Sequence, residues 1–124
     1  MKSILMLFIG FLAFSTASQA QKALPDAIYT SQAVSISTFE NVLKSVKEAK
    51  FSVQTSDKND GTIRANLPGS NTNAVNVLIY KSDGITFIEA NFSTNGSAAK
   101  DLAKLLSNSL KNNFPDLITT INLK

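Results

Sequence analysis

The sequence predicts a two-layer α+β domain in which a helix, a four-stranded antiparallel meander and a second helix follow one another. Apolar residues recur at helical spacing in 38–49 and again in 97–114. Between these segments apolar and polar residues alternate around two turn signals, Asp60-Gly61 and Asp83-Gly84. Because each amphipathic helix must bury one stripe, we expect both helices on the same face of the sheet.

The first 20 residues are expected to be a cleavable secretory signal peptide. Lys2 precedes an apolar run over 4–14, and the small residues Ser18 and Ala20 occupy the positions that define a cleavage site. The run is too short for an ordinary membrane span, and no cysteine lies near the cut for lipid attachment. We therefore expect a periplasmic or secreted protein without a membrane span after cleavage.

The composition excludes several function classes. The chain has 124 residues, enough for one domain, and it contains no cysteine, histidine or tryptophan. Zinc and iron sites normally draw on cysteine and histidine, so we expect no metal and no other cofactor. The excess of 12 basic over 9 acidic residues is too small to indicate a nucleic-acid partner.

Residues 21–36 are expected to form an N-terminal arm or a weak strand, because their apolar pieces are short. A single α+β domain is expected over 37–124. Its first helix, over about 38–49, begins with a predicted capping box formed by Ser37 and Glu40. The helical stripe that follows consists of Phe39, Val42, Leu43, Val46 and Ala49.

The first hairpin is expected to join strands 51–56 and 62–67. A three-residue loop over 59–61, with Gly61 left-handed, places Thr55 opposite Ala65 and Val53 opposite Leu67. A two-residue loop would pair apolar with polar positions, so the strand register favours the longer loop.

The second hairpin turns at Asp83-Gly84, a sequence typical of a two-residue type I′ loop. That loop places three apolar pairs on one face: Ile79 with Ile88, Val77 with Ala90, and Val75 with Phe92. Loop chemistry and hydrophobic pattern agree here without adjustment.

The second helix is expected to start at Ser97 as its cap and to stop before Pro115. Its expected apolar stripe is Ala98, Leu102, Leu105, Leu106 and Leu110, with Ser109 as a polar gap. Alternation of Leu117, Thr119, Ile121 and Leu123 is compatible with a fifth strand at the C-terminal end.

No residue pattern indicates catalysis. Most of the acidic residues stand in turns or at helix starts, where their ordinary role is structural. The loop Asp57–Thr62 is rich in oxygen ligands but fails the calcium-loop pattern, since Pro68 stands where the final glutamate belongs. We therefore expect a protein that is not an enzyme.

The second hairpin predicts an apolar surface on the side away from the helices. Leu78, Tyr80, Ile85 and Phe87 are expected there, with Tyr80 opposite Phe87, beside polar Asn76, Glu89 and Asn91. Four such side chains would expose roughly a few hundred Å², about the largest patch that a monomer tolerates. The patch is the candidate binding surface of the chain.

Three interpretations of this patch stay open. The N-terminal arm or C-terminal tail could cover it, using Ile28, Tyr29, Val34 or the segment 117–123. It could contact another protein or a second copy of the chain, or it could bind an apolar or sugar ligand on Tyr80 and Phe87. A contact surface of a non-enzymatic binding protein is our leading hypothesis. The alternatives are a small-ligand carrier and a hydrolase or isomerase that uses Asp, Glu, Ser or Lys in a helix–sheet cleft.

Overall fold

The computed structural model describes residues 24–32 and 38–123, and within these ranges it contains six strands and two helices. In chain order these are β1 (Ala27–Ser31), α2 (Thr38–Glu48), β2 (Ser52–Asp57), β3 (Thr62–Asn66), β4 (Ala74–Ser82), β5 (Ile85–Phe92), α3 (Gly96–Asn113) and β6 (Ile118–Ile121). The expected signal peptide and Ser37 of the expected capping box lie outside the described residues.

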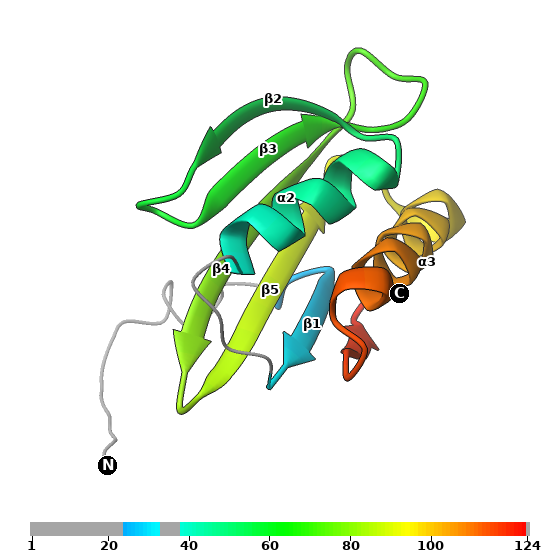
Figure 1. Ribbon diagram of the computed structural model, residues 1–124. Coiled ribbons are helices and arrows are strands. Elements are labelled where there is room, and N and C mark those ends of the chain that lie inside the picture. The colour runs from blue at the N-terminus through cyan, green and yellow to red at the C-terminus, as the bar shows by residue number, and fades with distance from the viewer. Residues whose placement is uncertain (1–23, 33–37, 124) are drawn as a thin grey trace, which may run out of the picture.

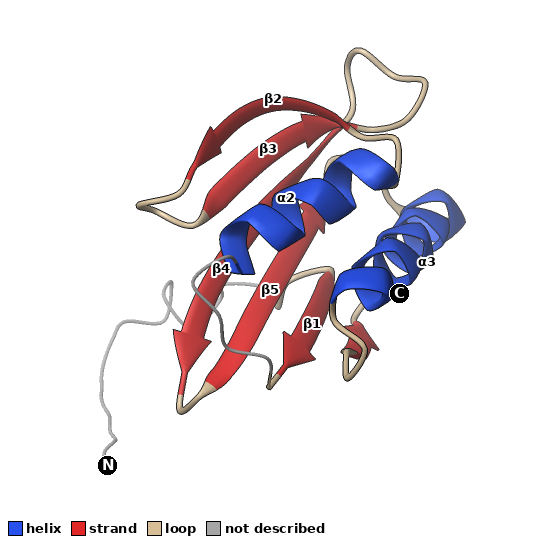
Figure 2. Ribbon diagram, in the orientation of Figure 1, coloured by secondary structure: helices blue, strands red, loops and turns tan. Residues whose placement is uncertain are grey.

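The strands form one antiparallel sheet in the order β2-β3-β4-β5-β1-β6 (Figure 1). Both helices lie on the same face of it (Figure 2). The expected α+β class is confirmed, but the sheet is larger than the expected four-stranded meander. β1 and β6 continue it beyond β5, which would otherwise be an edge with unpaired backbone groups.

The register of the second hairpin is confirmed. Ile79 pairs with Ile88, and the same register continues through Val75 and Phe92. Asp83 and Gly84 both have positive φ, 53° and 78°, as a type I′ loop requires. A two-residue loop therefore fixes which side chains of β4 and β5 face the helices.

The predicted register of the first hairpin is wrong, although Gly61 is left-handed as expected, with φ of 70°. Asp57 pairs with Thr62, so the loop contains four residues, 58–61. The Asp57 carboxylate accepts a hydrogen bond of 3.1 Å from the backbone N–H of Asp60, which stabilises this longer turn. A bulge between Val53 and Thr55 then brings Val53 opposite Ala65, and not opposite Leu67.

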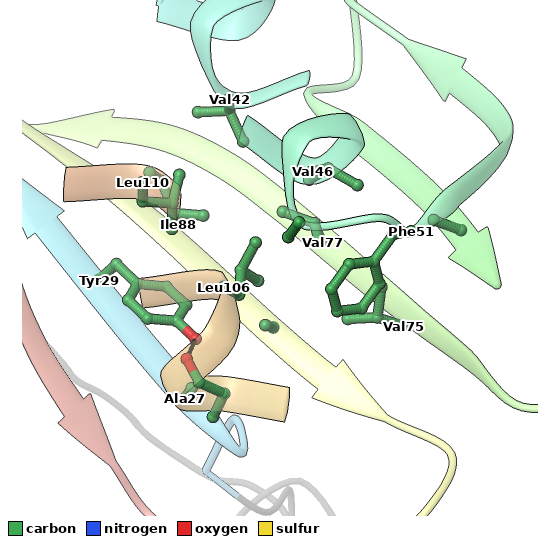
Figure 3. Packing of buried hydrophobic residues seen from close by; sticks show 14 of the residues in the cluster. Ala27, Tyr29, Val42, Val46, Phe51, Val75, Val77, Ile88, Leu106 and Leu110 are labelled. Carbon is green, nitrogen blue, oxygen red and sulfur yellow. Dashed lines mark hydrogen bonds between the residues drawn. The ribbon is translucent and has the colours of Figure 1, made fainter. Parts of the chain in front are cut away.

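The hydrophobic core lies between the two helices and the sheet. Figure 3 shows side chains from both layers meeting there, and they include Val42, Val46, Leu106 and Leu110 of the helices and Val75, Val77 and Ile88 of the sheet. These side chains are at most 2% exposed. Burying such a side chain stabilises the fold by about 1.5–3 kcal/mol, so the residues at this interface orient the sheet relative to the helices.

Helix α2 matches its prediction, but the apolar stripe of α3 is turned relative to the expected one. Leu105 is 40% exposed, whereas the small residues Ala99 and Ala103 are fully buried. The reason is Tyr29 of β1, whose hydroxyl lies 2.8 Å from the carbonyl oxygen of Ala103. The large ring is accommodated because alanines face it. Ser97 lies inside α3, whose N-cap is Asn95.

Candidate binding surface on the open face of the sheet

The sheet face opposite α2 and α3, which we name the open face, carries the four residues of the expected patch. On β4 and β5 they alternate with the residues that face the helices. Leu78 is 39% exposed and Tyr80 38%, while Ile85 and Phe87 are half-buried. The structure thus brings all four predicted residues together on one surface.

Tyr80 and Phe87 are directly opposite one another and their rings are stacked. Their ring centroids lie 5.2 Å apart and the ring planes differ by 4°. An aromatic pair of this kind stabilises the sheet by about 0.5–1.5 kcal/mol beyond the area it buries. It also fixes two large side chains before any partner arrives, which reduces the entropy that contact would cost.

Glu89 is a further member of this surface. The Tyr80 hydroxyl donates a hydrogen bond to Glu89 Oε2, and Glu89 lies between Leu78 on β4 and Ile28 on β1. This hydrogen bond is the main reason that the pKa of Tyr80 rises to about 12, with partial burial adding to it. Strand alternation places Glu89 on the open face, but nothing in the sequence indicates its bond to Tyr80.

The arm and the tail do not cover the patch with the segments that were expected to do so. Tyr29 points to the helices, and β1 and β6 lie beside β5 within the sheet. Val34 lies outside the described residues. The two strands instead widen the open face, where Ile28 pairs with Glu89 and Ile118 is 65% exposed.

A depression of about 750 Å³ adjoins the patch. Its floor comes from β3, β4 and β5 and includes Arg64, Asn76, Leu78, Glu89 and Asn91, and its wall is formed by Leu24 and Pro25. The wall is anchored because Asn122 Nδ2 donates a 2.9 Å hydrogen bond to the Pro25 carbonyl. The segment before β1 therefore has a fixed place beside the open face.

The acidic side chains with resolved contacts serve the backbone. Asp26 accepts a hydrogen bond of 2.8 Å from the N–H of Phe92. Asp116 accepts hydrogen bonds from the Ser31 hydroxyl and the Gln32 N–H, and these bonds lower its pKa below the ordinary range. These carboxylates hold β1 at both of its ends and have no arrangement suited to acid–base work.

Across residues 24–32 and 38–123, no group of three or more acidic side chains is placed to hold a metal ion. Neither helix in that part of the chain is long and apolar enough to cross a membrane. Comparison with protein-family models and with curated proteins found no match to this chain.

Proposed function

We propose that the protein is a small secreted or periplasmic binding protein without enzymatic activity. In this proposal it contacts another protein, or a second copy of itself, through Leu78, Tyr80, Ile85 and Phe87. The observation that carries the proposal is the stacked pair of Tyr80 and Phe87 on a sheet face that no described helix covers.

Two properties of the surface support this role. It is rigid, because its side chains stand on the two central strands of the sheet and because Tyr80 is held by both Phe87 and Glu89. It is also apolar at its centre and polar at its margin, where Asn76 and Asn91 lie. Protein interfaces share this arrangement, with aromatic residues in the middle and a polar rim.

The test is a double substitution of the aromatic pair, Tyr80→Ser with Phe87→Ser. We expect the fold to persist, as judged by circular dichroism, and association to be lost in sedimentation and light-scattering measurements. Leu105→Ser is a matched control, since it removes a similarly exposed apolar side chain on the helical side. A wild-type protein that stays monomeric and binds no partner in pull-downs, just as the double variant does, contradicts the proposal.

A further inference from the structure

The depression beside the patch carries two opposite charges at its two sides. Arg64 stands on β3 in one cross-strand row with Asn76 and Asn91, and Glu89 stands on β5 in the next row, opposite Leu78. With strands about 4.8 Å apart and a rise of about 3.4 Å per residue, the Cα atoms of Arg64 and Glu89 are roughly 12 Å apart. A ligand between them would meet a positive group at one end and a negative group at the other.

Neither charge is neutralised by a described residue. Arg64 Nη1 donates a 2.9 Å hydrogen bond to Asn76 Oδ1, and Glu89 accepts from the Tyr80 hydroxyl, so each charge is oriented by a neutral partner. The ion pair that the described ranges contain, Lys58 with Glu40, lies elsewhere. Arg64 therefore keeps most of its donors for a carboxylate, which a guanidinium binds through two parallel hydrogen bonds.

We propose that this depression binds a short peptide of two or three residues with free termini. Its C-terminal carboxylate pairs with Arg64 and its terminal ammonium with Glu89. An extended chain of three residues spans about 10 Å, which fits the distance between the two side chains once both lean into the depression. This site goes beyond the proposed function, because it uses charged residues that the contact patch does not contain.

The centre of the depression suits a peptide backbone. Asn76 Oδ1 is occupied by Arg64, and Asn91 Oδ1 accepts a 3.1 Å hydrogen bond from the N–H of Asp26. Both amide NH₂ groups are thereby turned toward donation, which is what peptide carbonyls require. Leu78 and Leu24, 39% and 70% exposed, offer apolar contact to a side chain of the peptide.

The first experiment measures binding of the tripeptide Ala-Leu-Ala by isothermal titration calorimetry. We expect acetylation of its amino end, or amidation of its carboxyl end, to weaken binding about tenfold each, since each removes one charge-assisted contact. Absence of binding by the free tripeptide, or equal binding of the free and capped forms, overturns the proposal.

Two variants assign the ends of the peptide. In Arg64→Gln we expect amidation to make no further difference, and in Glu89→Gln we expect the same for acetylation. Lys100→Gln and Asp101→Asn carry the same charge changes on exposed positions of α3 and should leave the tenfold effects intact. If these controls weaken binding as much as the site variants do, the attraction is a general effect of charge and the site is refuted.

Phe87→Ser separates this proposal from the contact patch. It removes an aromatic ring from the patch but leaves Arg64 and Glu89 in place. Tripeptide binding that survives in Phe87→Ser, in a protein that never associates, would refute the contact patch and retain the peptide site. Association without tripeptide binding would do the reverse.

Discussion

The Tyr29 hydroxyl donates a hydrogen bond of 2.8 Å to the backbone carbonyl of Ala103, and this bond ties β1 to the middle of α3. Tyr29 is fully buried, and 74 residues separate the two partners along the chain. The bond closes the sheet against the helical layer at the strand that the sequence indicates most weakly.

Removing this hydroxyl should weaken the fold measurably. We expect Tyr29→Phe to lower the free energy of unfolding by about 1 kcal/mol, the usual value of one buried hydrogen bond. Tyr29→Ala should lower it by about 3–5 kcal/mol, because it also leaves a cavity under α3. Urea denaturation checks both values. Tyr80→Phe is the matched control on the exposed tyrosine and should change stability by less than either.

Alkaline pH should destabilise the protein through the same residue. Burial raises the pKa of the Tyr29 phenol above its ordinary value of about 10. Because the folded pKa exceeds the unfolded one, this contribution to stability is complete below pH 10 and is lost progressively as the pH rises above it. The free energy of unfolding should fall more steeply with pH in the wild type than in Tyr29→Phe, and parallel curves would contradict this.

The bond between Tyr80 and Glu89 should be visible in a phenol titration. In Tyr29→Phe only one of the two tyrosines remains, so phenolate absorbance reports Tyr80 alone. We expect a pKa near 12, lowered toward the ordinary value when Glu89→Gln removes the carboxylate that accepts the hydrogen bond. Circular dichroism on the same samples monitors unfolding. A pKa that stays unchanged in Glu89→Gln would show that the bond does not exist in solution.

Gly61 should be far less tolerant of substitution than Gly69. Both are left-handed, with φ of 70° and 74°, but only at Gly61 would an added Cβ overlap backbone, the carbonyl oxygen of Ile79. Gly69→Ala should lower the free energy of unfolding by about 1–2 kcal/mol for its conformation alone. Gly61→Ala should exceed that by at least about 2 kcal/mol, as the hairpin must also move away from β4. Equal losses in urea denaturation would contradict the close approach.

The second hairpin was predictable because its information is local. The Asp83-Gly84 loop and the alternation around it specify the same register, and that register decides where Tyr80 and Phe87 point. The place of β1 was not predictable in this way. Its five residues pair with β5 and β6, which lie far along the chain, so no neighbouring turn indicates the pairing.

Single-residue irregularities account for the remaining errors. The bulge between Val53 and Thr55 shifts the pairing of the first hairpin by one position, and its cause is the packing of Val53 opposite Ala65 in the finished sheet. Glu89 was visible as a residue of the open face, but its bond to Tyr80 depends on side-chain conformations that alternation does not specify. Pattern therefore predicts faces, while tertiary contacts decide which polar groups meet.

The orientation of α3 gives the last prediction, since it separates two adjacent leucines that the sequence places on one stripe. Leu106 is fully buried against the sheet and Leu105 is 40% exposed. We expect Leu106→Ala to lower the free energy of unfolding by about 2–5 kcal/mol, because its cavity cannot be filled by water or by neighbouring groups. Leu105→Ala should cost about 1 kcal/mol or less, and urea denaturation of both variants measures the difference. Equal losses would mean that α3 is turned so that both leucines reach the core, and Ala103 would then lie too far from β1 to accept the Tyr29 hydrogen bond.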